Sequence, residues 1–273
     1  MRRRQMLAAT LAAPLAVPLA AGGLARPALA YVPPPLAVDP IDRLYTPWWR
    51  KRFAEKQAEI LRRPPNLLML GDSITQDYEK RGPPAWRDFV PVWDHFYGGR
   101  KAINLGFIGD ATSHLIWRLI HGELEHMRPA GAVLLIGANN MGAPHWGARD
   151  TILGIEAIIQ LCKQRQPQMK MVLLSVLPSI RSAWITATTA RINAGLAARY
   201  GGGKIPGVTY VDVTSIFEHG GVVDASLYLD PHLDPPQPPL HPTAQAQARM
   251  AAMIEPAVAA MLGDRPRGTM VWS

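Results

Sequence analysis

Short apolar runs alternate along the chain with segments whose apolar residues recur at helical spacing. Five runs, at 67–70, 102–106, 132–137, 171–177 and 208–213, are apolar at successive positions, as in parallel strands buried on both faces. Apolar stripes of helical period cover residues 115–127, 152–162 and 250–262, and Pro256 is expected to kink or split the last helix. This alternation predicts a doubly wound α/β sandwich with no internal repeat and no second domain.

The segment before the first run predicts an arm followed by a helix. Residues 31–40, YVPPPLAVDP, are rich in proline and favour an extended arm. In PWWRKRFAEKQAEILRR, Trp49, Phe53 and Ile60 recur near helical spacing with charges between them. We expect this helix to pack on the main domain, with a lid or membrane-surface helix as the alternative. The predicted organisation is an arm and helix over 31–65, a main domain over 66–265 and a tail over 266–273.

The first 30 residues have the pattern of a secretory signal peptide. A basic start precedes an Ala/Leu-rich middle, and Ala28-Leu29-Ala30 provides a small-residue cleavage site. We expect cleavage after Ala30 and a periplasmic or secreted protein, and the consecutive arginines also permit the twin-arginine route. No later run reaches about 18 apolar residues, so no stable membrane anchor is expected.

Composition and charge narrow the class of protein. The 273 residues are 48% hydrophobic and 18% charged, as in a globular protein with a real core. The formal charge of +8 includes Arg2, Arg3, Arg4 and Arg26 of the signal segment, and without these four it becomes +4. A nucleic-acid partner is therefore not expected. The only cysteine, Cys162, lies in a helical stripe; it cannot form an internal disulfide and is expected to be a core residue.

Polar motifs follow three of the predicted strands and precede the last helix. They read GDSIT, GFIGDAT, GANN and HPTAQAQ. In such a sheet, ligands bind beyond the carboxyl ends of the strands. Ser73 is then a nucleophile on a strand-to-helix turn or only a helix cap. Gly109 can bring its N–H close to a ligand before Asp110, the expected cap of the next helix; Asn139 supplies an amide donor and His241 a base.

Taken together, the four motifs resemble those of the SGNH or GDSL hydrolase superfamily. Residues 103–129 are especially similar to the catalytic subunits of brain-type platelet-activating-factor acetylhydrolases and their bacterial relatives. The resemblance implies a flavodoxin-like three-layer sandwich with a five-stranded parallel sheet. It also implies ester hydrolysis through an acyl-Ser73 intermediate, without metal or cofactor. His241 is then the base, and the N–H groups of Ser73 and Gly109 with the Asn139 amide form the oxyanion hole.

One departure from the family concerns the carboxylate that orients the histidine. The usual pattern is Asp-Xaa-Xaa-His, but Pro238 stands three residues before His241. The sequence LYLDPHLDPPQPPLHPTA leaves Asp230 and Asp234 as possible partners. Because Asp230 ends an apolar run, we interpret the following PHLDPPQPP as an inserted loop and choose Asp230. A Ser–His dyad without a carboxylate is the remaining alternative.

The same motifs allow other interpretations, which the residues favour less. An α/β-hydrolase elbow requires glycine where Thr75 stands, and GFIGDA lacks the dinucleotide-binding fingerprint. A metal site at Asp230, His232 and Asp234 is a minor alternative. A binding protein on a degenerate fold, or an acyltransferase using the same acyl-enzyme, remains open.

The expected substrate is a short acyl ester, such as an acetyl ester, on a carbohydrate or lipid. The aromatic side chains of Trp86 and Trp93 either stack on sugar rings or fill core space. The sequence leaves the acyl-chain length and the oligomeric state open.

Overall fold

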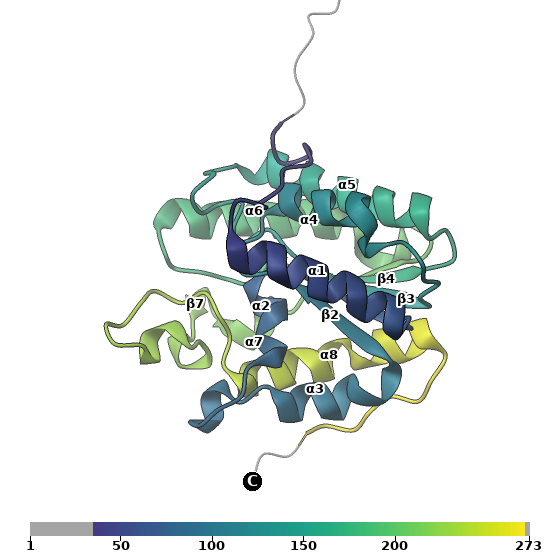
Figure 1. The fold of residues 1–273 in the computed structure, drawn as a ribbon. Helices are drawn as coiled ribbons and strands as arrows, with labels where there is room; N and C mark the ends of the chain where they lie inside the picture. The colour runs from purple at the N-terminus through teal and green to yellow at the C-terminus, as the bar shows by residue number, and fades with distance from the viewer. Residues whose placement is uncertain (1–34, 271–273) are drawn as a thin grey trace, which may run out of the picture. The chain divides into compact units, whose positions relative to one another are not determined.

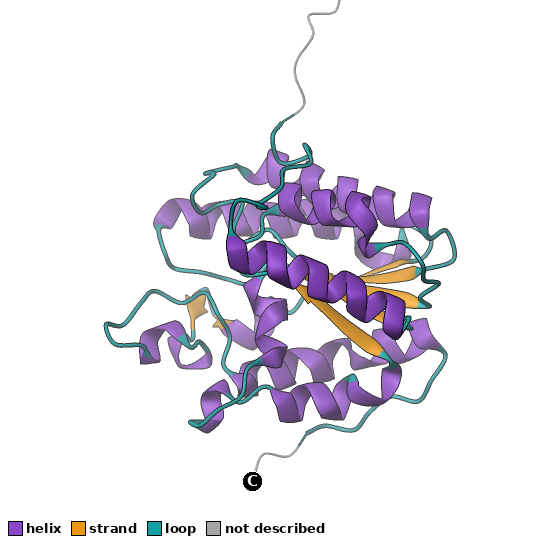
Figure 2. Ribbon diagram, viewed as in Figure 1, coloured by secondary structure: helices purple, strands orange, loops and turns teal. Residues whose placement is uncertain are grey.

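A five-stranded parallel sheet forms the centre of the computed structural model, which describes residues 35–270 (Figures 1 and 2). The strand order is β2-β1-β3-β4-β5, the flavodoxin-like order of a doubly wound sheet. Every strand is parallel to its neighbours, and β1 pairs with β2 and β3. The predicted fold class and all five predicted strands are confirmed. The strands are β1 (Leu67–Gly71), β2 (Ala102–Gly106), β3 (Gly131–Leu135), β4 (Lys170–Leu174) and β5 (Val208–Val211).

Helices cover both faces of this sheet, as Figure 1 shows. One face packs against α4 (Thr112–Arg118), α5 (Ala148–Arg165) and α6 (Ala183–Tyr200), and the other against α3 (Val90–Phe96), α7 (Thr214–Phe217) and α8 (Ala244–Leu262). The four-residue helix α2 (Ser73–Gln76) follows β1, and the hairpin strands β6 (Glu218–His219) and β7 (Val222–Val223) follow α7. Two apolar cores therefore lie on the two sides of the sheet.

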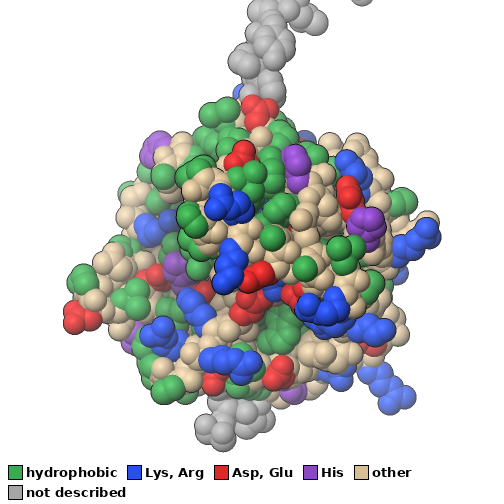
Figure 3. All heavy atoms as spheres, viewed as in Figure 1, with side chains coloured by type: hydrophobic (Ala, Val, Ile, Leu, Met, Phe, Trp, Pro, Cys, Tyr) green, Lys and Arg blue, Asp and Glu red, His purple; other side chains and the backbone are tan. Residues whose placement is uncertain are grey.

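The predicted N-terminal helix is α1 (Pro47–Arg62), and it lies along edge strand β2. Trp49, Phe53 and Ile60 are buried, which confirms that this helix packs on the main domain. Arg52 donates to the Gly106 carbonyl at 2.9 Å and Arg63 donates to the Ala102 carbonyl at 3.1 Å, so α1 satisfies backbone acceptors at both ends of the strand. Figure 3 shows acidic and basic side chains interleaved over this face of the molecule.

Two predictions about helices need correction. Of the predicted kink or split at Pro256, the split is wrong, because α8 runs through this proline as one helix. Proline removes one backbone donor there, but Pro256 is exposed, so the affected turn faces solvent. Met250, Ile254 and Val258, on either side of it in sequence, remain buried. The stripe over 115–127 is not one helix either: α4 passes into a π-helical turn, Leu119–Glu123, in which Gly122 has φ +117°.

Some sequence predictions concern burial or the chain ends. Cys162 is fully buried, as predicted, and burial raises the pKa of its thiol to about 12. The predicted signal peptide lies outside the described residues. Within residues 35–270, no helix combines the length and apolar character needed to cross a bilayer.

Candidate active site

Ser73 occupies the tight turn between β1 and α2. Asp72 is the N-cap of α2 and accepts a hydrogen bond from the Ile74 N–H at 3.0 Å, so the serine hydroxyl is not used for capping. A Cβ on Gly71 would collide with the Thr75 side chain and the Leu135 carbonyl, which explains the glycine at the end of the strand. The turn therefore presents the Ser73 hydroxyl at the carboxyl edge of the sheet.

The imidazole of His241 contacts the hydroxyl of Ser73. The distance from Ser73 Oγ to His241 Nε2 is 2.9 Å, although the residues are 168 positions apart in sequence. His241 lies just before Thr243, the N-cap of α8, whose hydroxyl accepts a hydrogen bond from the Ala246 N–H. The Leu229 N–H donates to the His241 carbonyl at 2.7 Å and so holds the backbone of His241 against the segment that precedes Asp230. Nε2 is thus positioned to receive the serine proton.

The structure places Asp230, and not Asp234, against His241. The Asp230 Oδ1 lies 2.7 Å from His241 Nδ1, and its Oδ2 accepts backbone N–H bonds from His241 at 2.6 Å and Leu240 at 2.7 Å. Asp230 is buried, whereas Asp234 is exposed on the intervening loop. The loop returns through Gln237, whose N–H donates to the Asp230 carbonyl at 2.9 Å.

These contacts shift the pKa values of the acid and the base in opposite directions. Burial lowers the pKa of His241, but the hydrogen bond and charge of Asp230, with further help from Asp77 and Asp72, raise it above the ordinary value of 6.5. Burial raises the pKa of Asp230, but hydrogen bonds from the His241 side chain and backbone lower it below 3.8 overall. The pair therefore favours a carboxylate that stabilises a protonated imidazole.

Gly109 and Asn139 lie on neighbouring loops at the same sheet edge. Gly109 has φ +76°, a conformation that suits glycine, and a Cβ there would approach Arg43 Nη1 to 3.1 Å. The Asn139 amide donates to the Asp110 carbonyl at 3.1 Å, which joins the two loops. Within residues 35–270, the N–H groups of Gly109 and Ser73 donate to no protein acceptor. The N–H groups of Ser73 and Gly109, and the second hydrogen of the Asn139 amide, are the donors available to a developing oxyanion.

Asp110 has a different role from the predicted helix cap. The N-cap of α4 is Ala111, and the buried carboxylate of Asp110 accepts hydrogen bonds from Trp49 Nε1 at 2.8 Å and Arg118 Nε at 2.9 Å. A second acid, Glu123, pairs with Arg118. A fully buried carboxylate needs such partners, which explains why Asp110 is not a cap.

Sequence reasoning missed this buried network around Asp110. The available signal was Arg118, a charged residue inside the apolar helical stripe. Because Asp110 directly follows Gly109, the network also holds the glycine loop in place.

The three residues of the alternative metal site do not lie together. Asp230 is engaged with His241, His232 stacks on Trp86 with ring centroids 5.1 Å apart, and Asp234 is exposed, so the three do not form one site. No set of three His, Cys, Asp or Glu side chains in the described part of the chain is arranged to hold a metal ion. Trp93 packs against Tyr78 and Tyr97.

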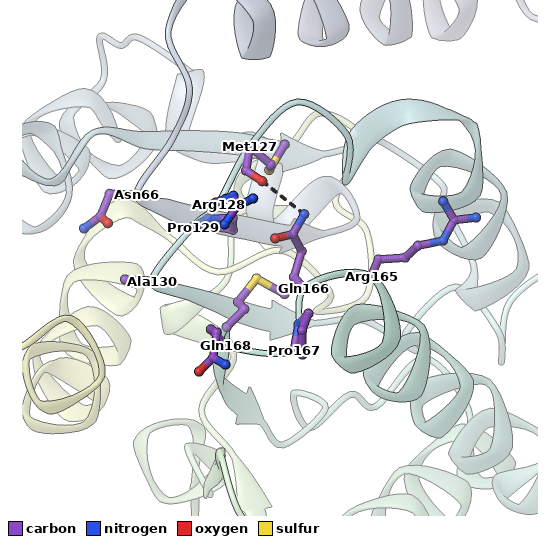
Figure 4. A pocket seen from close by; sticks show the side chains of 10 residues that line it. Asn66, Met127, Arg128, Pro129, Ala130, Arg165, Gln166, Pro167 and Gln168 are labelled. Atoms are coloured by element: carbon purple, nitrogen blue, oxygen red, sulfur yellow. Dashed lines mark hydrogen bonds between the residues drawn. The ribbon is translucent and has the colours of Figure 1, made fainter.

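A separate surface cavity of about 520 Å³ lies at the opposite, amino-terminal end of the strands (Figure 4). It is lined by residues such as Asn66, Ala130 and Met169, each next to the start of a strand, and by the exposed Arg128. It contains none of the predicted site residues.

Comparisons with known proteins agree with this geometry. A family model described as "GDSL-like Lipase/Acylhydrolase family" matches residues 69–249. Over 130 residues the chain is 37% identical to "Platelet-activating factor acetylhydrolase IB subunit alpha1" of Bos taurus, covering 48% of this chain and 51% of that protein. The chain spans about half the length of the first curated relatives it matches.

Two solved structures share the fold. A GDSL-like lipase from Bacteroides thetaiotaomicron has a TM-score of 0.56 at 21% identity, with 77% of this chain and 97% of that chain covered. A carbohydrate esterase family 3 protein from Talaromyces cellulolyticus has a TM-score of 0.54 at 14% identity, with 73% and 98% covered. These two matches show that the chain shares its fold with both proteins.

Proposed function

Because the chain belongs to the GDSL-like lipase and acylhydrolase family, we propose that it is a carboxylic ester hydrolase whose reaction is carried out by Ser73, His241 and Asp230. The observation that carries this assignment is the continuous contact from Ser73 Oγ to His241 Nε2 at 2.9 Å and from His241 Nδ1 to Asp230 at 2.7 Å. Such a chain of contacts activates a serine and orients its base.

The reaction proceeds in two steps through an acyl-enzyme. Ser73 Oγ attacks the ester carbonyl while His241 Nε2 takes the hydroxyl proton. The N–H groups of Ser73 and Gly109 and the Asn139 amide stabilise the negative oxygen of the tetrahedral intermediate. His241 then protonates the departing alcohol, and a water molecule activated by the same imidazole releases the acid. Asp230 stabilises the imidazolium in both steps.

The substrate we propose is a short acyl ester, such as an acetyl ester, on a carbohydrate or lipid outside the cytoplasm. The names of two similar proteins support this class: one relative is an acetylhydrolase, and one protein with the same fold is a carbohydrate esterase. The signal-peptide pattern of residues 1–30 supports export to the periplasm or beyond, by the general or the twin-arginine route. Transfer of the acyl group to a sugar hydroxyl is the alternative outcome of the same intermediate.

Labelling by a fluorophosphonate tests the assignment, because this probe reacts with activated serines. We expect the purified chain to be labelled and to hydrolyse p-nitrophenyl acetate in the presence of a chelator. Ser73→Ala should lose both properties with a melting temperature close to wild type. The matched control is Ser226→Ala, an exposed serine that should leave both unchanged. Full labelling or activity of Ser73→Ala would refute the mechanism.

A further inference from the structure

Arg181 lies between the two loops that carry Asn139 and His241. It belongs to the segment between β4 and α6, on the carboxyl side of the sheet. Its Nη2 donates to the Ala138 carbonyl at 3.0 Å, directly before Asn139, and its Nε donates to Ser179 Oγ at 3.1 Å. The buried Ser179 hydroxyl donates in turn to the Pro239 carbonyl at 2.9 Å, two residues before His241. The guanidinium is therefore held at the edge of the candidate active site.

Among the arginines of residues 35–270 that are not exposed, Arg181 alone has no carboxylate partner. Four other arginines of residues 35–270 are not exposed, and each pairs with a carboxylate: Arg43, Arg52, Arg100 and Arg118. No carboxylate of the described residues lies within 4.0 Å of a nitrogen of Arg181. A half-buried cation without an anion has lost part of its hydration without gaining an ion pair.

The remaining N–H groups of Arg181 are available to a ligand. Only Nε and Nη2 bond to protein acceptors in the part of the chain that the structure describes, and no nitrogen of Arg181 is both buried and unsatisfied. Burial lowers the pKa of Arg181, while the charges of Asp230 and Asp72 raise it, so the side chain is close enough to the site to sense both acids. Two fixed hydrogen bonds also reduce the entropy lost when a planar anion binds.

We propose that Arg181 is a specificity-determining residue that binds an anionic group on the alcohol part of the ester. The alcohol departs next to His241, which protonates it, and Arg181 is braced against the loop that carries this histidine. The substrate class is therefore an acyl ester of a sugar acid or of a sugar or glycerol phosphate. This inference rests on the proposed function and narrows its substrate.

Two pairs of esters that differ only in an anionic group test the proposal. The first pair is an acetylated methyl glucoside and the corresponding acetylated methyl glucuronide, and the second is 1-acetylglycerol and its 3-phosphate. We expect the wild-type chain to have a kcat/KM about 10- to 100-fold higher for the anionic member of at least one pair. Preference within the first pair identifies a carboxylate, and preference within the second identifies a phosphate. The preference should fall as salt is raised, because screening weakens the ionic contact.

Variants separate recognition by Arg181 from a structural role. Arg181→Gln should bring the ratio of kcat/KM between anionic and neutral ester close to one, chiefly through KM, and Arg181→Lys should keep part of the ratio. Arg191→Gln, at an exposed arginine of α6, should leave the ratio at the wild-type value.

Several outcomes would overturn the proposal. These are an equal kcat/KM for both members of each pair in the wild type, or a loss in Arg181→Gln by the same factor for both members. If the wild type hydrolyses neutral esters without preference, only this inference fails. If it hydrolyses none of the four and is not labelled at Ser73, the proposed function fails with it.

Discussion

Replacing Asp230 by asparagine is the most informative single change, because the structure predicts which tautomer of His241 results. The two oxygens of Asp230 have separate duties: Oδ2 accepts the N–H groups of Leu240 and His241, and Oδ1 faces His241 Nδ1. In Asp230→Asn, the amide oxygen is expected to keep the two backbone donors. The NH₂ group then faces Nδ1, which must become an acceptor, so the proton moves to Nε2. A protonated Nε2 cannot accept the proton of Ser73.

The size of the effect follows from this change of tautomer. Loss of a triad carboxylate with the geometry retained lowers turnover by up to about 10⁴, or roughly 5 kcal/mol of transition-state stabilisation. The two backbone hydrogen bonds survive in the variant, so the free energy of unfolding near pH 8 should change by only about 1 kcal/mol. Catalysis and stability should therefore separate.

The pH dependence gives a second, independent readout. The pKa of His241 is raised, so wild-type kcat/KM should rise with pH through a midpoint above 6.5, and in Asp230→Asn this midpoint should move down. The stabilisation from the charged pair is lost as pH falls through the lowered pKa of Asp230, and also as pH rises through the raised pKa of His241. The variant should thus lose most stability between about pH 3.8 and 6.5, the ordinary pKa values of the two groups.

The assay is hydrolysis of p-nitrophenyl acetate from pH 5 to 9, together with thermal unfolding at each pH. Asp234→Asn is the matched control, because its exposed carboxylate lies on the same loop and should be neutral in both measurements. A kcat/KM for Asp230→Asn within threefold of wild type would show that His241 works without this carboxylate. A large loss in Asp234→Asn would contradict the geometry itself.

Two further predictions concern side chains beside the catalytic contacts. Asn139→Ala should lower kcat by about 10² to 10³ with little change in melting temperature. The control Asn140→Ala should instead lower the melting temperature, because the fully buried Asn140 amide bonds to both the backbone N–H and the hydroxyl of Thr112. Steady-state kinetics and calorimetry distinguish the two variants, and a kcat of Asn139→Ala within threefold of wild type would give Asn139 a structural role. Burial raises the pKa of Asp72 to about 7, so the folded state loses stability relative to the unfolded state as pH rises from 3.8 through 7. Asp72→Asn keeps the acceptor for the Ile74 N–H and should stabilise the fold above pH 7 by up to about 4 kcal/mol, but little near pH 4. Unfolding in urea at both pH values measures this difference.

Most of the sheet was predictable from sequence because β1, β2 and β3 are buried at every position, and β4 at all but its first, so that these strands read as continuous apolar runs. The edge strand β5 is less buried and is exposed at Thr209. The positions of Ser73 and His241 followed from their places at the ends of regular elements. The partner of His241 was harder, since a proline-rich loop can bring back either Asp230 or Asp234, and only the backbone N–H groups of Leu240 and His241 make Asp230 the fitting acceptor.

Features that depend on tertiary neighbours were not predictable. Asp110 has the sequence context of a helix cap, and only the burial of Arg118 shows where its carboxylate points. Arg181 reads as an ordinary surface residue in a loop, because nothing local shows that its neighbours are the Ala138 carbonyl and Ser179. Pro256 has the spacing of a helix breaker, but its solvent-facing position lets α8 continue.

The support of the Gly109 loop by α1 and by Arg43 before it changes which residues a shortened form of this chain has to keep. The match to the family model begins at Met69. Two residues before that point, Trp49 on α1 and Arg43, donate hydrogen bonds to the carboxylate of Asp110. Arg43 also donates to the Ile108 carbonyl at 2.7 Å. The Gly109 loop is therefore held in place by a segment that lies before the part of the chain matched by the family model. Engineering of this chain, by grafting or by fusion at its first strand, therefore has to keep Arg43 and α1 together with the Gly109 loop.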